Sequence, residues 1–429
     1  MSKRSTLAVS VGVFLGALGC GSSGGTKSDG ASGGNAGVSA TGGTTSGGGG
    51  TASGGVSGSA TGGSATGGSA TGGSATGGST TGGSATGGGT GGGATGGSAT
   101  GGSPTGGTGT GGSGGAACAT PGIRVDGRKL VVDCAPYHVR GVNWNPVPRG
   151  ATHPAGLDYD GLAEVDVPLM QAAGINTVRT YEALADTSVL DRLHAAGIRV
   201  LSTVYGYGGD AASVVTARVN AAKSHPAILG WVLGNEWNYN GLYTDLSHAD
   251  SLARINEAAE LVKAADTTHP VITVYGELPT TQTLGAMPNV DVWGINAYRG
   301  IGFGDLFTTW ASRSEKPMFL SEYGADAYNA NLPGYDPMSQ AQATAALTEE
   351  LLAKSSALTA SGVTLGGTIF EWADEWWKAG NPNTQEAGGV APGGGPYPDQ
   401  TFNEEYWGIV DIDRRPRPAY EELKRLYVP

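Results

Sequence analysis

The sequence has few cysteine and histidine residues, which limits the kinds of site that it can build. Its 429 residues include 3 Cys and 6 His, and the histidines form no His-Glu-x-x-His or His-x-His pair. A catalytic metal is therefore not expected. The sequence also has no Gly-x-x-x-x-Gly-Lys-Ser/Thr phosphate loop, and Asp411-Ile412-Asp413 lacks the rest of a calcium loop. These absences predict a protein that needs neither a metal nor an organic cofactor.

Basic residues are outnumbered by acidic ones. The chain has 25 Lys and Arg against 37 Asp and Glu. Because three of the basic residues and one of the acidic residues lie before residue 118, the remainder carries 22 basic and 36 acidic residues, a net charge of −14. This sign argues against nucleic acid and against anionic lipid headgroups as partners.

Trp and Tyr are absent from the first 117 residues, and charged residues are almost absent there. Residues 21–117 are mostly Gly, Ser, Thr and Ala, with Ser-Ala-Thr-Gly-Gly repeated from Ser59 onward at a period of five. Because such a segment has no apolar stripe to bury, it cannot offset the entropy lost on ordering. The sequence predicts a disordered Gly/Ser/Ala/Thr linker over residues 21–117, ahead of a folded domain at residues 118–429.

Residues 1–20 have the pattern of an export signal. Lys3 and Arg4 precede an apolar run, Leu7–Leu18, which is too short to span a bilayer and is followed by Gly19-Cys20. A Cys at the cleavage site resembles the bacterial lipoprotein lipobox, so Cys20 is the predicted lipidation site. We expect a lipoprotein of the outer membrane or cell surface, anchored in the membrane at Cys20. The alternative is a secreted protein whose signal is simply cleaved.

The other two cysteines flank the start of the predicted domain. With Cys20 lipidated, Cys118 and Cys134 remain as a predicted disulfide, which suits an exported protein. A bond that closes so short a loop stabilises the fold by about 3 kcal/mol in the chain-entropy model. Two free thiols are the alternative.

The domain is predicted to be α/β, a (β/α)8 TIM barrel, because eight short apolar runs alternate with amphipathic segments. The predicted strands are Val139–Asn143, Thr177–Thr180, Val200–Val204, Ile228–Gly234, Val271–Val274, Val292–Asn296, Met318–Ser321 and Thr368–Phe370. The helical segments between them include Asp160–Ala173, Ala249–Ala265 and Ser339–Ala360. An open doubly wound sheet is the alternative, but no Gly-rich phosphate loop follows the first strand.

Glycine and proline mark the ends of these elements. Gly174, Gly197 and Gly362 each follow a helical segment, where a left-handed residue would end the helix. Pro226, Pro270 and Pro317 each precede a strand, where a helix cannot continue. Ahead of the first strand, residues 124–132 read as a β-hairpin with Asp-Gly at its turn, placed to close the bottom of the barrel.

Two glutamates end apolar strands, where an ionised carboxylate is costly unless it is paired or used. Glu236 lies in Leu-Gly-Asn-Glu-Trp after the fourth strand, and Glu322 in Phe-Leu-Ser-Glu-Tyr-Gly at the seventh. In a barrel the carboxyl ends of the strands form one face, which is the catalytic face. Two carboxyl groups that face each other there are what glycoside cleavage with retention requires.

The residues at the strand ends resemble the clan of retaining β-glycosidases that share a (β/α)8 barrel. The set is Arg at the second strand, Asn-Glu at the fourth, Tyr at the sixth, Glu at the seventh and Trp at the eighth. The segment around Glu322 is similar to the nucleophile segment of family 2 barrels and of β-1,3-glucanosyltransferases. Residues 140–144, Arg-Gly-Val-Asn-Trp, are similar to family 5 cellulases and mannanases.

The resemblance implies a role for each matching residue. Glu236 would be the acid/base and Glu322 the nucleophile, with their carboxyl groups ~5–5.5 Å apart. Asn235 would bond the 2-hydroxyl of the sugar, and Arg179 and Tyr298 would keep Glu322 ionised and oriented. The alternative is that the two glutamates are only buried ion-pair partners of Arg179.

Two tryptophans are predicted to bind substrate. Trp372 would form the floor of the subsite where the bond breaks, and Trp144, after the first strand, would line it; both have core packing as the alternative. Glu182, Glu277 and Glu371 also lie at strand ends and read as supporting or capping groups. The long loop over residues 376–406 is expected to shape the cleft.

The sequence therefore predicts a retaining β-glycoside hydrolase that cleaves a neutral β-linked polysaccharide or oligosaccharide, a glucan or a mannan. Its partner is a carbohydrate substrate. A β-glucan transglycosylase with the same two glutamates is the first alternative. A non-catalytic carbohydrate-binding lipoprotein on the same fold is the second.

Overall fold

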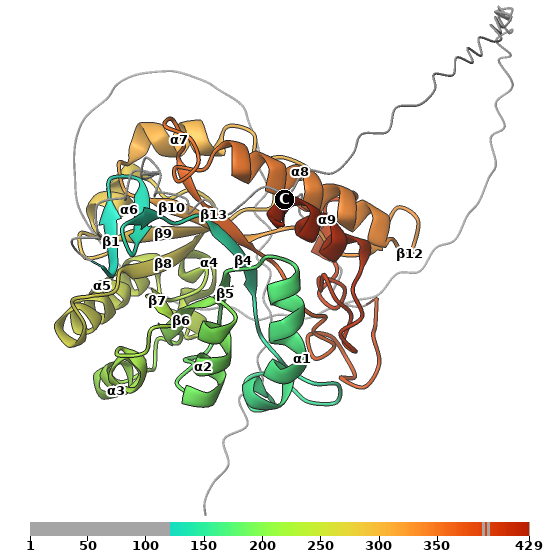
Figure 1. Ribbon diagram of the computed structural model, residues 1–429, viewed down its shortest axis with the longest axis horizontal. Coiled ribbons are helices and arrows are strands. Elements are labelled where there is room, and N and C mark those ends of the chain that lie inside the picture. The colour runs from blue at the N-terminus through green and yellow to red at the C-terminus, as the bar shows by residue number, and fades with distance from the viewer. Residues whose placement is uncertain (1–120, 388–390, 393–394, 429) are drawn as a thin grey trace, which may run out of the picture. The chain divides into compact units, whose positions relative to one another are not determined.

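The computed structural model describes residues 121–387, 391–392 and 395–428 (Figure 1). The predicted signal and linker, with Cys20 and Cys118, lie outside the described residues. Cys134 takes part in a disulfide bond, and its pairing with Cys118 stays a prediction.

The central element is a closed barrel of eight parallel strands, which confirms the predicted (β/α)8 fold. Going round the barrel, the strands follow chain order and the last pairs with the first. Their bounds are β4 Val139–Asn143, β5 Thr177–Arg179, β6 Arg199–Tyr205, β7 Ile228–Leu233, β8 Val271–Gly276, β9 Val292–Asn296, β10 Met318–Tyr323 and β13 Thr364–Ile369. Two of the eight have the predicted bounds, and the others differ by a few residues at their ends.

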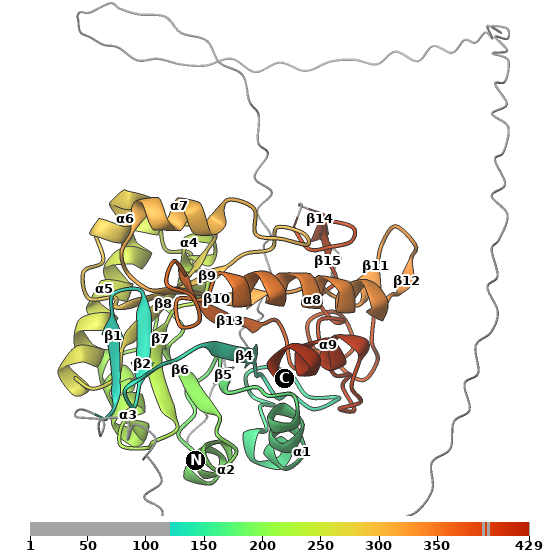
Figure 2. The same ribbon diagram turned by 45° about the horizontal axis from the view of Figure 1, so that its top comes forward.

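Helices connect the strands and cover the outside of the barrel (Figures 1 and 2). Polar side chains begin five of them, each accepting a hydrogen bond from a backbone N–H of the first turn: Asp158, Asp186, Ser247, Thr280 and Asp336. The helices are α1 Tyr159–Ala172, α2 Thr187–Ala195, α3 Ala212–Ala222, α4 Trp237–Asn240, α5 His248–Ala265, α6 Thr281–Gly285, α7 Leu306–Arg313, α8 Pro337–Ala353 and α9 Pro418–Tyr427. No helix of the described residues is both long and apolar enough to cross a membrane.

The predicted helix over Ser339–Ala360 was wrong in its last seven residues, because α8 ends at Ala353. Beyond it, Ser355 Oγ lies 2.8 Å from His138 Nδ1, and Ser356 Oγ donates to the carbonyl of Arg128. Serine side chains that bond elsewhere do not support a continued helix. Gly362 also has a different role from the predicted one: a Cβ there would lie 2.1 Å from the carbonyl oxygen of Ser355. Close approach of two backbone segments therefore explains this glycine.

A β-hairpin closes the end of the barrel at which the strands begin. Strand β1 (Ile123–Asp126) pairs antiparallel with β2 (Lys129–Val132), and Gly127 takes the left-handed conformation in the turn. Leu130 and Val132 pack against residues near the beginnings of the barrel strands, including Val139, Leu229, Val292, Phe319 and Leu365. The opposite end, where the strands finish, holds the loops with the short strands β11 (Tyr328–Asn329), β12 (Gly334–Tyr335), β14 (Ala391–Pro392) and β15 (Thr401–Phe402) (Figure 2).

Candidate active site

Glu322 lies near the end of β10 and accepts three hydrogen bonds. Arg179 Nη1 donates to its Oε1 over 3.0 Å and Tyr181 Oη to the same oxygen over 2.7 Å, while Tyr298 Oη donates to Oε2 over 3.0 Å. The side chain is only 6% exposed. Charge-assisted hydrogen bonds of this kind favour an ionised carboxylate and fix its orientation. The predicted contacts of Arg179 and Tyr298 with Glu322 are present.

Arg179 also joins Glu322 to the end of β7. Its Nη2 donates to Asn235 Oδ1 over 2.7 Å, and its Nη1 donates to Asn143 Oδ1 over 3.1 Å. Burial opposes the charge of this guanidinium, but the neighbouring Tyr181 and Glu322 raise its pKa. The cation is therefore fixed within the barrel, and it places Asn235 beside Glu322.

Glu236 follows β7 directly, in the left-handed conformation with φ 46° and ψ 35°. A non-glycine residue in this region is uncommon and is often found at a functional site. Burial, the charge of Glu322 and the charge of Glu404 raise the pKa of Glu236 to about 7, against a hydrogen bond from Asn296 and the charge of Arg179. The residue is half-buried, which agrees with burial as the first cause of the raised pKa.

The two glutamates thus share one site with contrasting surroundings. Glu322 has three donors that favour the carboxylate, whereas Glu236 has neighbours that favour the protonated acid near neutral pH. Two carboxyl groups kept in opposite ionisation states can act as a nucleophile and a general acid. Glu322 is among the charges that raise the pKa of Glu236, and the catalytic roles of the two residues stay predictions.

The two tryptophans predicted to bind substrate lie elsewhere, and that prediction was wrong. Trp144 is fully buried, donates Nε1–H to Asp166 Oδ2 over 2.9 Å and packs edge-on against Tyr159 of α1. Trp372 is 1% exposed and packs against Tyr420 of α9. Both rings fill the space between the barrel and its helices, so neither has surface to offer a sugar.

Other aromatic rings surround Glu322 instead. Phe370, at the end of β13, lies edge-on to Tyr181 with ring centroids 6.5 Å apart, and Trp407 packs against Phe370 at 5.4 Å. Trp407 also packs against Tyr298 at 5.2 Å. These rings lie beside the two tyrosines that bond Glu322, but Phe370 is 7% and Trp407 1% exposed, so they pack behind the tyrosines and support them.

Tyr181, which donates to Glu322, and Asn296, which donates to Asn235, were not among the predicted site residues. Their signal was position alone, since each follows or ends a barrel strand on the catalytic face. Phe370 had the same positional signal, since it follows β13, whereas Trp407 had none. Trp407 lies 38 residues beyond the end of β13, and only the fold of the intervening loop brings it to the site.

A charged group lies beside these rings, and we refer to Glu371, Glu375, Lys378 and Glu404 as the Lys378 cluster. Lys378 Nζ lies 2.8 Å from Glu375 Oε2, 3.2 Å from Glu404 Oε2 and 4.5 Å above the Phe370 ring. Burial and the charge of Glu375 raise the pKa of Glu371 well above its usual range. The cluster adjoins Tyr181, which donates to Glu322, because Phe370 packs between Lys378 and the Tyr181 ring.

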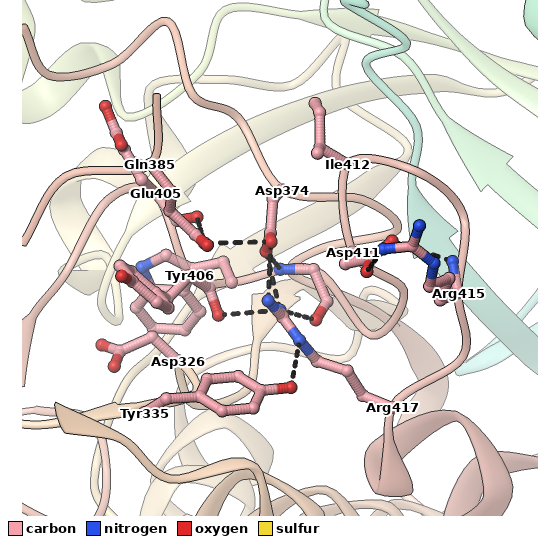
Figure 3. Close-up of polar contacts among 12 residues, drawn as sticks. Asp326, Tyr335, Asp374, Gln385, Glu405, Tyr406, Asp411, Ile412, Arg415 and Arg417 are labelled. Atoms are coloured by element: carbon pink, nitrogen blue, oxygen red, sulfur yellow. Dashed lines mark hydrogen bonds and ion pairs between the residues drawn. The ribbon is translucent and has the colours of Figure 1, made fainter. Parts of the chain in front are cut away.

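The long loop after β13 is held in place by a buried ion pair (Figure 3). Arg417 donates to both oxygens of Asp374 over 2.6 Å, and its Nε donates to Tyr335 Oη over 3.2 Å. Gln385, from the loop, donates to Asp374 Oδ2 over 3.1 Å, and Ala379 N donates to Glu405 Oε1 over 3.0 Å. These contacts fasten the loop to the barrel end and so position the Lys378 cluster.

The remaining strand-end glutamates have separate partners. Glu277 pairs with Arg299 over 2.6 Å, and Glu182 accepts a hydrogen bond from Tyr207 over 2.8 Å. Among the residues that the structure describes, no group of three or more His, Cys, Asp or Glu side chains could hold a metal ion.

Comparison with known proteins gives a family match and more distant relatives. Residues 207–429 match the family model described as glycosyl hydrolases family 2, TIM barrel domain. Mouse β-glucuronidase is 28% identical over 229 residues, which are 48% of this chain and 34% of the mouse protein. The 1,3-β-glucanosyltransferase gas5 of Schizosaccharomyces pombe is 24% identical over 272 residues, 56% of this chain and 51% of that protein. The chain thus spans about a third to a half of the length of these relatives.

Solved structures show the same fold at lower identity. A family 2 β-galacturonidase of Eisenbergiella tayi superposes with a TM-score of 0.51 at 19% identity, covering 71% of this chain and 53% of that one. A β-glucuronidase of Bacteroides uniformis gives 0.54 at 17% identity, covering 71% of this chain and 37% of that one. These likenesses confirm the barrel architecture.

Proposed function

The chain belongs to the glycosyl hydrolase family 2 TIM barrel domain family, and from this premise we propose that it is a retaining β-glycosidase acting on a neutral β-linked glucan or mannan. The observation that carries the proposal is the contrast between the two glutamates. Glu322 accepts three hydrogen bonds that favour its anion, and burial and the charge of Glu322 raise the pKa of Glu236 to about 7. This arrangement is what double displacement at an anomeric carbon requires.

In the first step, Glu322 attacks the anomeric carbon and forms a C–O bond while the glycosidic C–O bond breaks. The proton of Glu236 moves to the leaving oxygen, so the departing sugar leaves as an alcohol. In the second step, Glu236 takes a proton from water, whose oxygen attacks the same carbon and releases Glu322. Asn235, held by Arg179 and Asn296, is placed to bond the 2-hydroxyl of the sugar.

The charges of the site favour a neutral sugar. Its two cations are Arg179, which bonds Glu322 and Asn235, and Lys378, which bonds Glu375 and Glu404. Both are therefore compensated by carboxylate groups of the chain. A substrate carboxylate would enter a site with an excess of negative charge, which opposes its binding.

The test compares three variants of the full-length protein on an aryl β-glycoside that the wild type cleaves. Glu322→Gln should lower kcat by about 10⁴-fold or more, since it removes the nucleophile. Glu236→Ala should retain turnover of substrates with good leaving groups and gain activity in azide, which can attack the glycosyl-enzyme. Glu277→Gln is the matched control: this strand-end glutamate pairs with Arg299, and its loss should leave kcat within about twofold.

Two results would reject these roles. Wild-type activity in both Glu322→Gln and Glu236→Ala would show that the glutamates are structural partners of Arg179. Binding of polysaccharide by the wild type, with no release of reducing ends, would instead indicate a carbohydrate-binding protein.

A transglycosylase is the second candidate, and two observations favour it. The similarity to the S. pombe glucanosyltransferase covers 56% of this chain. Near Glu236, Tyr239 and Tyr243 are 58% and 50% exposed, and their rings could support an acceptor sugar in place of water. Chromatography of the products distinguishes the two: chains longer than the substrate indicate transfer, and only shorter chains indicate hydrolysis.

We also propose that the protein is exported and anchored through a lipid on Cys20, with residues 21–117 as the linker. The support is the sequence pattern of residues 1–20. Labelling of the expressed protein with a radioactive fatty acid tests the anchor, and Cys20→Ser should abolish the label.

A further inference from the structure

Several buried polar atoms near the Lys378 cluster have no hydrogen-bond partner among the described residues. They are Glu371 Oε1, Asn145 Oδ1, Trp377 Nε1 and Trp407 Nε1. Each is connected to the cluster: Asn145 donates to Glu375, Lys378 lies 5.9 Å above the Trp377 ring, and Trp407 packs on Phe370 beneath the ammonium group. Buried polar atoms are nearly always satisfied in native proteins, so a set of unpaired donors and acceptors indicates a place where a polar ligand binds.

The cluster lies next to the catalytic glutamates. Burial, the charge of Glu322 and the charge of Glu404 raise the pKa of Glu236. Phe370, beneath Lys378, packs against Tyr181, which donates to Glu322. The side chains of Lys378 and Glu404, which are 19% and 25% exposed, are therefore the groups of the cluster that a sugar bonded to Glu322 can reach.

Lys378 is charged, and carboxylate groups of the chain take up most of its hydrogen-bonding capacity. Burial opposes its charge, while the neighbouring carboxylates raise its pKa well above the usual value. Its ammonium group has three N–H donors, of which Glu375 and Glu404 take two. One donor remains for a ligand, and the charge around it is net negative.

We propose that the Lys378 cluster binds the hydroxyl groups of the sugar that Glu322 attacks and selects a neutral sugar over a uronic acid. The neutral hydroxyl can accept from Lys378 and donate to Glu404 or Glu371, whereas a uronate carboxylate would meet the glutamates with the same sign of charge. The selection thus lies in the carboxylates that hold Lys378. This inference rests on the proposed function and names the residues that set its substrate class.

The experiment measures kcat/KM of the full-length protein at pH 6 on 4-nitrophenyl β-D-glucoside, β-D-mannoside and β-D-glucuronide. The wild type should prefer the better neutral substrate over the glucuronide by about 100-fold or more. Glu404→Gln removes one negative charge and loosens Lys378, so the ratio of glucuronide to neutral activity should rise about tenfold. Glu404→Asp keeps the charge and should stay near the wild-type ratio.

Lys378→Met should lower kcat/KM for the neutral substrate about tenfold, mainly through a higher KM, and should not raise kcat/KM for the glucuronide. Lys263→Met is the matched control, because Lys263 also pairs with a carboxylate, Asp291, at 2.7 Å but belongs to α5. It should leave all three values unchanged. Circular dichroism and the melting temperature establish that each variant is folded.

An unchanged ratio in folded Glu404→Gln would overturn the inference while leaving the β-glycosidase in place. A wild type that prefers the glucuronide would overturn the inference and the neutral substrate class of the proposed function, but it would leave the β-glycosidase activity in place. A wild type that cleaves none of the glycosides, and no polysaccharide, would overturn the proposed function and the inference with it.

Discussion

Glu236 and Glu322 have different neighbours, and this difference predicts the pH dependence of the reaction. Because the pKa of Glu236 is raised to about 7 by burial and by Glu322, its proton is present below that pH and is lost above it. We therefore expect kcat/KM to fall as pH rises through about 7, by about tenfold per pH unit once the acid is ionised.

A pH–rate profile on a substrate with a poor leaving group measures this limb. In Glu236→Ala, assayed with an activated aryl glycoside, the limb near pH 7 should disappear. In Glu404→Gln it should move to lower pH, because Glu404 is one of the charges that raise the pKa. A limb that persists unchanged in Glu236→Ala would assign it to another group.

The sequence predicted which polar strand-end residues gather at the site, but it did not predict where the two tryptophans lie. Arg179, Asn235, Glu236 and Glu322 are costly to bury without partners, so their presence at strand ends was informative in itself. A Trp fits a core and a sugar site equally well, and Trp372 packs on a helix that begins 46 residues later in the chain. Such long-range packing leaves no local pattern in the sequence.

At the scale of elements, β13 begins at Thr364, four residues before its predicted start. The prediction began too late because Gly366 and Gly367 interrupt the apolar pattern of this strand. Gly366 has a φ of +116°, and a Cβ there would lie 2.2 Å from the carbonyl oxygen of Val139 in β4. Glycine is usually a sign against a strand, but here it permits the last strand to approach the first. The closure of the barrel depends on this residue.

Gly366→Ala should accordingly destabilise the fold by about 3 kcal/mol or more, through backbone conformation and steric overlap. Gly285→Ala is the control, since nothing lies within 4 Å of a Cβ at that position. Urea unfolding followed by Trp fluorescence gives both values. Equal stability of the two variants would show that the β13–β4 contact adapts without cost.

The loop after β13 depends on the buried pair of Arg417 and Asp374 (Figure 3). Removing one partner of a buried pair leaves the other charge uncompensated, so Arg417→Met should destabilise the protein by about 3–5 kcal/mol. Arg425→Met should leave the stability close to that of the wild type, because its pairs with Glu349 and Glu422 are exposed.

Thermal unfolding and limited proteolysis test this prediction. Faster cleavage within residues 376–406 of Arg417→Met, with a lower kcat/KM, is the expected result, because the loop carries Lys378 and Glu404. Stability and proteolysis equal to those of Arg425→Met would contradict the anchoring role.

For the whole molecule, several buried carboxyl groups predict lower stability at higher pH. Burial raises the pKa of Asp326 and Glu405 to about 7 and of Asp374 to about 6, and Glu236 is also near 7. Their unfolded pKa values are near 4, so the folded state binds more protons between pH 4 and 7 and loses stability as pH rises through this range. His138, whose pKa burial lowers to about 4, acts in the opposite direction below pH 6.5.

Burial lowers the pKa of His153 as well as that of His138, but the carboxyl groups with raised pKa values outweigh these two imidazoles, so the free energy of unfolding should fall by roughly a few kcal/mol between pH 5 and pH 8. Urea unfolding at the two pH values measures the difference. Asp326→Asn should reduce it. A protein that is more stable at pH 8 than at pH 5 would contradict the assignment of raised pKa values.

The architecture of the molecule was the most predictable feature, because eight alternations of strand and helix leave one common solution for about 300 residues. The pairing of Glu236 with Glu322 followed from it, since the strand ends share one face. Of the Lys378 cluster only Glu371, at a strand end, had a positional signal; Glu375, Lys378 and Glu404 come from a loop that has no periodic pattern, and buried contacts determine its path.

The hairpin of β1 and β2 has a practical consequence for work with the purified enzyme. It seals the barrel at the end away from Glu236 and Glu322, and the described chain enters there. A capture tag fused ahead of Pro121 would thus hold the protein on a resin or sensor chip by its closed base. The opposite end of the barrel, where the strands finish, would remain accessible to long, insoluble polysaccharide fibres, which an assay in solution cannot present.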